Sequence, residues 1–167
     1  VRVLRDENAV PHIFAKSRAD AFFGLGHAHA EERLWQMHLA RLRITGRLTE
    51  VYGQLALEND IRMRALGYAE RARVALENLP DEARDLLEAY ASGVNAYLES
   101  EDFRGPPEGI LTQVSIPPWT ALDCLHVLFS FWPTLAKNLE DELRYHRIRR
   151  IAGERVAAEL RRPFPST

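Results

Sequence analysis

The most constraining feature of the sequence is its first third, where a short alternation of apolar and polar residues precedes one long amphipathic run. Apolar residues on either side of the polar segment 5–8 predict two short strands joined by a turn within residues 1–16. Ser17 is suited to cap a helix, and Asp20 stands three residues later in the capping-box position. Apolar residues then recur at roughly helical spacing until Gly46, which is typical of a helix end. The sequence therefore predicts a helix of about 28 residues, roughly 42 Å long.

Two glycines lie inside this predicted helix. Gly24 and Gly26 would each cost about 1 kcal/mol relative to alanine in a helix interior. We therefore expect either that another segment approaches the helix closely at these positions or that the helix is broken there.

The rest of the chain is predicted to be helical on both sides of one loop. The composition is that of a globular chain of ordinary domain size, with 167 residues of which 46% are hydrophobic and 28% charged. We treat it as one domain, mostly α, with strands only near the N-terminus. Its predicted parts are strands in 1–16, helices in 17–100, a loop at 101–118 and further helices in 119–162. The individual helices after the first are expected at 58–79, from Pro80 to about Leu98, at 121–135, at 138–151 and, after a break at Gly153, at 154–162.

Charge and composition exclude several functional classes. The net charge of −2 gives no electrostatic reason to bind nucleic acid or anionic membranes. No apolar run approaches the roughly 20 residues that a membrane span needs. The single cysteine, Cys124, rules out an internal disulfide framework. Because Val1 is not a natural initiator and no signal peptide is present, we expect a mature chain whose targeting segment has been removed.

The sequence contains no recognisable active site of its own. No serine lies in a G-x-S-x-G motif, Cys124 has no local catalytic signature, and no glycine-rich phosphate loop is present. A pair of isolated strands is marginally stable in water, so we expect the N-terminal strands to join a sheet that another chain supplies. Two interpretations remain: a subunit of an enzyme whose nucleophile lies elsewhere, or a helical interaction module without enzymatic activity.

A metal-binding helical protein is a third alternative. His27, Glu31 and His38 lie along one flank of the predicted long helix, but His27 and His29 are two residues apart and do not share a helix face. The zinc-protease spacing HExxH is absent, so structural roles for these histidines are favoured over metal binding. Further charges in this helix indicate either solvated faces with i,i+4 pairs or buried ion pairs to a partner. These charged residues are Asp20, Glu31, Glu32, Arg33 and Arg41.

Two segments near the C-terminus invite a functional interpretation. The apolar stretch 129–136 contains Pro133, which breaks or kinks a helix, so the stretch forms either a core helix or the hydrophobic wall of a pocket. Residues 138–142 then form an acidic cluster at a predicted helix start. The cluster either complements the helix dipole or supplies carboxylates to a hard cation such as calcium, for which a partner would have to provide further oxygens.

A series of landmark residues runs in a fixed order along the chain, most densely in its first third and on into its second half. These landmarks include Arg5-Asp6, Pro11-His12-Ile13, Asp20, Gly24-Leu25-Gly26, Glu32-Arg33-Leu34, Arg41, Gly46-Arg47-Leu48, Glu50, Asp60, Leu66-Gly67, the block LLEAYASGVNAYL at 86–98, Pro118-Trp119 and Asp123. Their order resembles that of the small (α) chain of penicillin acylases, which belong to the N-terminal-nucleophile hydrolase superfamily.

This resemblance implies a precursor that cleaves itself into an α chain and a large β chain that begins with serine. The α-amine of that serine acts as the general base for its own hydroxyl, so no catalytic residue is expected on the present chain. The implied complete fold is a four-layer αββα sandwich, to which the α chain adds strands and around which it wraps helices. The implied location is periplasmic or secreted, and the implied partners are the β chain and a small N-acylated substrate.

The resemblance also implies site residues. Counting from Asp123, the acyl-pocket positions fall near Trp132, Leu135 and Ala136, beside Phe131. Penicillin G acylases resemble one another in having Met, Arg and Phe at these positions, and this sequence departs from all three. An apolar acyl group is therefore expected, as in acylases for penicillins with aliphatic side chains or for N-acyl homoserine lactones. A calcium-binding glutamate is expected at Glu142 or, with a two-residue gap, at Glu140.

Overall fold

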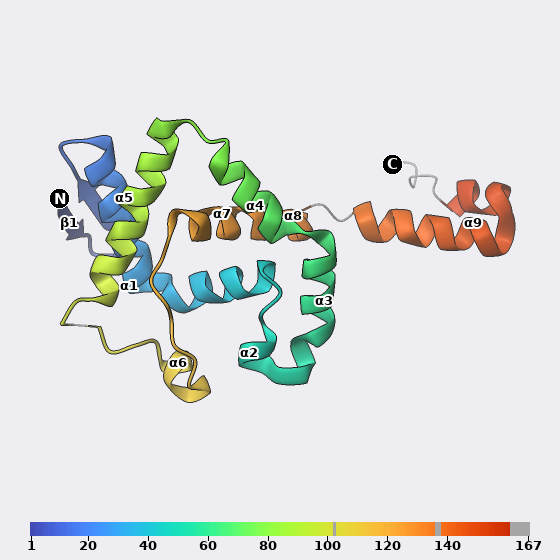
Figure 1. The fold of residues 1–167 in the computed structure, drawn as a ribbon, viewed down its shortest axis with the longest axis horizontal. Helices are drawn as coiled ribbons and strands as arrows, with labels where there is room; N and C mark the ends of the chain where they lie inside the picture. Colours follow the sequence, from blue (N-terminus) through green and yellow to red (C-terminus); the bar gives the residue numbers. More distant parts are fainter. Residues whose placement is uncertain (102, 136–137, 161–167) are drawn as a thin grey trace. The chain divides into compact units, whose positions relative to one another are not determined.

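An antiparallel hairpin at the N-terminus leads into a chain that is otherwise helical in the computed structural model (Figure 1). This confirms the predicted mostly-α chain with N-terminal strands. The structure describes residues 1–101, 103–135 and 138–160, the side chains of residues 138–140 excepted. The structure divides into two compact units, Val1–Ser130 and Phe131–Thr167.

The hairpin pairs β1 (Arg2–Arg5) with β2 (Pro11–Phe14). Asp6 organises the turn between them, because its carboxylate accepts hydrogen bonds from the backbone N–H of Asn8 at 2.9 Å and of Val10 at 3.0 Å. Every residue of β1 is exposed. Both predicted strands are thus confirmed, and the hairpin presents an open edge.

Helix α1 (Arg18–Ile44) is the predicted long helix, with 27 residues. Ser17 caps it as expected, since its hydroxyl accepts a hydrogen bond from the backbone N–H of Asp20 at 3.0 Å. The helix is not straight, because Arg33 leaves the helical region with φ −138° and ψ 17°. The segment after this kink carries residues of a buried polar cluster.

Helices α1 and α5 (Asp81–Leu98) cross at two glycines, one on each helix. A Cβ added to Gly26 would lie 2.1 Å from the carbonyl oxygen of Tyr90, and one added to Gly93 would lie 2.0 Å from that of Phe23. The close approach predicted from the glycines of α1 is therefore confirmed. The core beside this crossing contains Ala30, Leu34, Met37, Ala91, Val94 and Trp119.

Between α1 and α5 the chain forms several short helices: α2 (Thr49–Tyr52), the 3₁₀ turn η1 (Gly53–Ala56), α3 (Leu57–Leu66) and α4 (Tyr68–Glu77). The prediction of a single helix at 58–79 is wrong, because two helices, α3 and α4, lie in this range. Gly67 lies at φ +68°, ψ +27°, in the left-handed region that glycine adopts without a Cβ clash, and it separates α3 from α4.

The buried carboxylate of Asp60 fixes the corner at the start of α2. It accepts hydrogen bonds from the backbone N–H of Leu48 at 3.0 Å and of Thr49 at 2.8 Å, so a residue of α3 caps the N-terminus of α2. Burial raises the pKa of Asp60, but hydrogen bonds from Thr49, Asn59 and Leu48 outweigh burial and lower it overall.

A short helix, α6 (Pro107–Thr112), lies within the segment that was predicted to be a loop. The helix predicted at 121–135 ends earlier, because α7 runs from Ala121 to Ser130. Leu125 and Phe129 of α7 complete a second core cluster, whose other buried members are Ile44, Met63 and Ala72.

The second unit contains α8 (Trp132–Leu135) and α9 (Asn138–Leu160). Gly153 reverses the chain within α9 at φ 84° and ψ 168°, which confirms the predicted break. Glu154, just after the reversal, accepts a hydrogen bond from the Tyr145 hydroxyl at 2.8 Å and pairs with Arg149 at 3.0 Å. Among the described residues of the whole chain, no helix is both long and apolar enough to cross a membrane.

Candidate functional site

Three of the four residues predicted to line an acyl pocket lie on or beside the single turn of α8. Phe131, Trp132 and Leu135 are 54%, 46% and 75% exposed. The backbone N–H of Leu135 donates to the carbonyl oxygen of Phe131 at 2.8 Å, so Phe131 and Leu135 stand one helical turn apart. Ala136, the fourth residue, lies outside the described residues. The structure thus brings an aromatic and aliphatic surface together in one short segment.

Pro133 has a different consequence from the predicted kink within one helix. Helix α7 already ends at Ser130, and Pro133 is the second residue of α8, where a missing backbone N–H costs nothing. The chain therefore carries this apolar segment on a separate turn, with its large side chains exposed.

The predicted metal ligands are only partly described. Glu142 lies exposed on α9, and the side chain of Glu140 falls outside the described part of the chain. Within that described part, no three His, Cys, Asp or Glu side chains are grouped so that they could hold a metal ion. Two of the residues considered for a metal-binding helical protein make other contacts. Glu31 pairs with Arg5 at 2.6 Å, and His38 contacts Arg41 at 2.9 Å.

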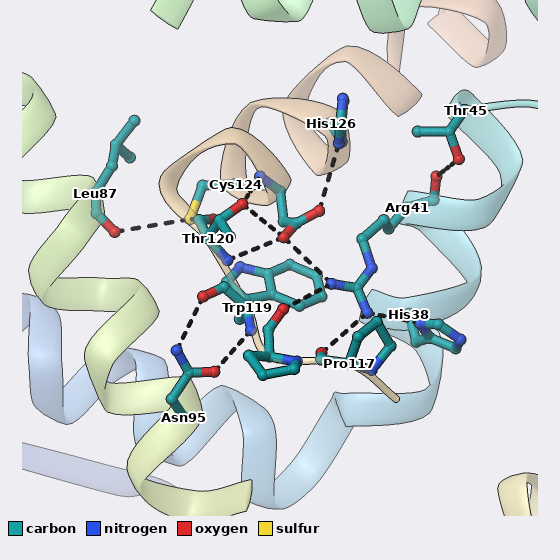
Figure 2. Close-up of polar contacts among 12 residues, drawn as sticks. His38, Arg41, Thr45, Leu87, Asn95, Pro117, Trp119, Thr120, Cys124 and His126 are labelled. Atoms are coloured by element: carbon teal, nitrogen blue, oxygen red, sulfur yellow. Dashed lines mark hydrogen bonds and ion pairs between the residues drawn. The ribbon is translucent and has the colours of Figure 1, made fainter. Parts of the chain in front are cut away.

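A buried polar cluster between α1, α5 and α7 was not predicted (Figure 2). Its centre is Arg41, which is only 5% exposed, so the interpretation of this residue as part of a solvated face is wrong. Its guanidinium pairs with Asp123 at 3.2 Å, lies over the ring of Trp119 at 4.7 Å and donates to Nδ1 of His38 at 2.9 Å. Arg41 thus joins α1 to the segment that begins α7.

Asp123 belongs to a capping box at the start of α7. Its carboxylate accepts hydrogen bonds from the backbone N–H and the hydroxyl of Thr120, at 2.9 and 2.8 Å, while its own N–H donates to the Thr120 hydroxyl at 3.3 Å. His126 lies one turn further on, with Nδ1 3.5 Å from the same carboxylate. The T-x-x-D spacing is a sequence signal that could have identified Asp123 as a capping residue, whereas its pairing with Arg41 has no such signal.

Asn95 holds the same segment from α5. Its side-chain amide donates to the carbonyl oxygen of Trp119 at 2.9 Å and accepts from the backbone N–H of Trp119 at 2.7 Å. This pair of bonds satisfies both backbone groups of a residue that is almost fully buried. In the sequence, Asn95 and Trp119 stand out only as landmarks of the family resemblance.

Burial and neighbouring charges shift the pKa values in this cluster. Burial raises the pKa of Asp123, but the opposing effects of His126, Arg41 and Thr120 leave it lowered overall. Burial, assisted by the positive charge of Arg41, lowers the pKa of His38 to about 4. At neutral pH the cluster therefore contains an ionised Arg41–Asp123 pair beside a neutral imidazole.

The state of His38 predicts a pH-dependent stability. Between pH 6.5 and about 4 the unfolded chain binds a proton at His38 that the folded chain does not, so the free energy of unfolding falls as the pH is lowered through this window. The loss attributable to His38 is at most about 3 kcal/mol. Urea unfolding followed by tryptophan fluorescence at a series of pH values measures it.

His38→Asn is the matched variant for this test, because the Asn side-chain oxygen accepts from Arg41 but does not titrate. We expect this variant to lose less stability than the wild type between pH 6.5 and 4. Equal slopes in the two proteins would contradict the assigned state of His38.

Cys124 and three of the serines that the structure describes show no sign of activation as nucleophiles. Burial raises the pKa of the Cys124 thiol to about 11, so the thiol is protonated at neutral pH. The hydroxyls of Ser92 and Ser130 donate to carbonyl oxygens of their own helices, and that of Ser100 donates to the carbonyl oxygen of Tyr97 at the end of α5. The arrangement therefore holds helices in place and exposes an apolar segment, and it does not place one of these side chains to attack a substrate.

Comparisons with a family model and with individual known proteins agree on one family. The family model described as Penicillin amidase matches residues 1–166. The chain is 40% identical over 146 residues, 81% of its length, to penicillin acylase 2 proenzyme from Pseudomonas sp. (strain SE83). It is 33% identical over 167 residues, 99% of its length, to the acyl-homoserine lactone acylase QuiP of Pseudomonas aeruginosa.

The chain spans about a fifth of the length of these curated relatives, 19% and 20% respectively. Among solved structures it is similar to a thermostable penicillin G acylase from Alcaligenes faecalis, with a TM-score of 0.78 and 24% identity. That likeness concerns the fold, and it covers 99% of this chain and 94% of the matched chain.

Proposed function

The chain belongs to the penicillin amidase family, and from this premise we propose that it is the α subunit of a heterodimeric acylase that hydrolyses the amide bond of an N-acylated small molecule. The observation that carries this proposal is the difference in length. The family match extends over almost the whole chain, yet the chain spans only a fifth of the curated relatives, one of which is named a proenzyme. A chain of nearly equal length occurs in a solved penicillin G acylase.

The proposed chemistry needs a nucleophile from the partner chain. The N-terminal serine of a large β subunit attacks the substrate carbonyl and expels the amine, and water then hydrolyses the resulting acyl-enzyme. A free α-amine with a pKa near neutrality is a suitable base for both steps at working pH. The lack of activation at Cys124 and at the serines described above agrees with this division of labour.

The β chain would also complete the fold. An exposed two-stranded hairpin is marginal by itself, and the open edge of β1 offers main-chain hydrogen bonds to a neighbouring strand. We propose that the hairpin extends a sheet of the β subunit and that the assembled heterodimer is a four-layer αββα sandwich. Both chains would derive from one self-cleaving precursor.

In this proposal the exposed segment Phe131–Leu135 forms part of the acyl-binding wall, with Ala136 following it. About half or more of each large side chain is open in this chain alone, so burying them against an acyl chain removes apolar surface from water. The absence of a charged residue between 131 and 136 favours an apolar acyl group, of the kind carried by N-acyl homoserine lactones or by β-lactams with aliphatic side chains.

Trp132→Ala tests the pocket. We expect it to change the preference among acyl-chain lengths more than amide hydrolysis in general, because removing the indole enlarges the wall without touching the nucleophile. A change in a hydrophobic pocket by one methylene is worth about 10–200-fold in selectivity. The measurement is kcat/KM for a series of N-acyl substrates of increasing length, and an equal loss on every length would reject the pocket assignment.

The proposal for calcium concerns a single carboxylate ligand from this chain. The cation takes six to eight oxygen ligands, and the described residues of this chain do not form such a set. We propose that Glu142, or Glu140 in its place, supplies one carboxylate to a calcium ion whose other ligands come from the β subunit. Because this chain alone does not fit a complete site, the ion has no role in the proposed reaction steps.

A periplasmic or secreted location is proposed with the function. The alternative of a non-enzymatic helical interaction module gains no support, because the relatives that cover most of the chain are named acylases.

Intact-mass analysis and N-terminal sequencing of everything that copurifies with the chain from its native source test the subunit assignment. We expect a larger partner whose first residue is serine. A homogeneous folded species of 19.1 kDa without a partner would reject the assignment.

A further inference from the structure

Two helices hold the segment that begins α7 by binding its backbone. From α1, the Arg41 guanidinium donates to the carbonyl oxygens of Pro117 and Pro118, each at 3.4 Å. From α5, Asn95 binds both backbone groups of Trp119. Figure 2 shows the two side chains converging on this segment from different helices. The position of the segment is therefore fixed through directional contacts as well as through packing.

The same contacts define the first turn of α7. The capping box of Thr120 and Asp123 fixes where the helix begins, and the ion pair between Asp123 and Arg41 fixes which side of this turn faces α1. Arg41 thus reaches both the backbone before the helix and the carboxylate inside its first turn. A lysine at this position would keep the charge but not the planar fork that makes several contacts at once.

Stability alone is a weak reason for this arrangement. A buried ion pair carries a large desolvation cost, and apolar residues of similar volume often stabilise a core equally well. Helix α7 already contributes Leu125 and Phe129 to an apolar cluster. Apolar packing is non-directional, whereas the hydrogen bonds and ion pair of Arg41 depend on distance and angle. Beyond what apolar packing provides, Arg41 therefore contributes a defined distance and orientation between α1 and the start of α7.

The geometry matters because the proposed acyl-binding wall comes directly after α7 in the chain. The helix has ten residues and ends at Ser130, and Phe131 is the first residue of the wall. We propose that Arg41 is a positioning residue for acyl-chain specificity, because by fixing the register and rotation of α7 it fixes the point from which the wall starts. This inference rests on the proposed function.

Arg41→Lys in the complete processed protein tests the inference. The readout is the ratio of kcat/KM between a long and a short N-acyl substrate that share one leaving amine. A displacement of about 1 Å can cost 100-fold in rate, so we expect this ratio to shift by about tenfold or more. A purely structural defect lowers the amount of folded enzyme and reduces both rates equally, which leaves the ratio unchanged.

Arg43→Lys is the matched control, since it makes the same exchange two residues further along α1, and we expect it to keep the wild-type ratio. If Arg41→Lys yields no processed enzyme, Thr120→Val provides a milder test, because Thr120 is exposed and its hydroxyl completes the capping box. An unchanged ratio in the variant that folds would overturn the positioning role. A wild-type protein that hydrolyses no member of the series would instead reject the proposed function, and the inference with it.

Discussion

Replacing either glycine at the crossing of α1 and α5 with alanine is expected to be the most damaging single-methyl change in this chain. At both positions the added Cβ would meet a backbone carbonyl oxygen at 2.0–2.1 Å. Backbone atoms of a packed helix do not rotate away, so the two helices would have to separate along their shared core. Overpacking of this kind typically costs 1–3 kcal/mol, and we expect Gly26→Ala and Gly93→Ala to cost about 3 kcal/mol or more.

Gly24→Ala is the matched control in the same helix. Its Cβ would meet the side-chain methyl groups of Val1 at 2.7 Å and Ile13 at 2.8 Å, which can move, rather than a backbone atom. The same gain in helix propensity applies to Gly24 and Gly26, so the difference between these two variants isolates the helix crossing. Urea unfolding midpoints of the purified protein provide the measurement. A Gly26→Ala variant as stable as Gly24→Ala would show that the crossing is looser than the structure indicates.

Removing the charge of Arg41 is the second change with a large expected effect. Arg41→Met keeps the apolar stem of the side chain but leaves the carboxylate of Asp123 buried without its cation. Breaking one side of a buried pair costs about 3–5 kcal/mol. The double variant Arg41→Met/Asp123→Asn is expected to recover part of this loss, because the remaining group at position 123 is then neutral.

The measurement is a double-mutant cycle of unfolding free energies. It uses the wild type, both single variants and the double variant, with Arg43→Met as a control for helix α1. The coupling energy between positions 41 and 123 is expected to exceed the roughly 0.5 kcal/mol within which independent sites are additive. Strict additivity would mean that the ion pair makes no net contribution and that Arg41 acts through packing alone.

Local features of the sequence predicted the elements well where one residue type decides the backbone. The cap at Ser17, the two strands of the hairpin and the break at Gly153 all follow from short-range chemistry, and all are present. The predicted helix boundaries were wrong where a break between two helices had no strong local signal in the sequence. A helical pattern continues on both sides of Gly67, and its left-handed conformation becomes evident only in the structure.

The family assignment also came from the sequence, through the order of landmarks that resembles penicillin acylases, and the family match confirms it. The detailed roles of Trp132, Leu135 and Phe131 stay predictions, although the structure places all three side chains at the surface. Ala136 and the side chain of Glu140 lie outside the part of the chain that the structure describes. The pocket and the calcium ligand therefore depend on experiments with the assembled protein.

What the sequence determined by itself was the kind of element formed by most segments, the choice between a close approach and a broken helix at Gly24 and Gly26, and the family. What only the tertiary structure decided was the identity of the partners: Tyr90 and Phe23 at the glycine crossing, and Asp123 for Arg41. The physical reason is sequence distance. Caps, turns and helical periods act within a few residues, whereas Arg41 and Asp123 are more than eighty residues apart and meet only because α1, α5 and α7 pack around one core.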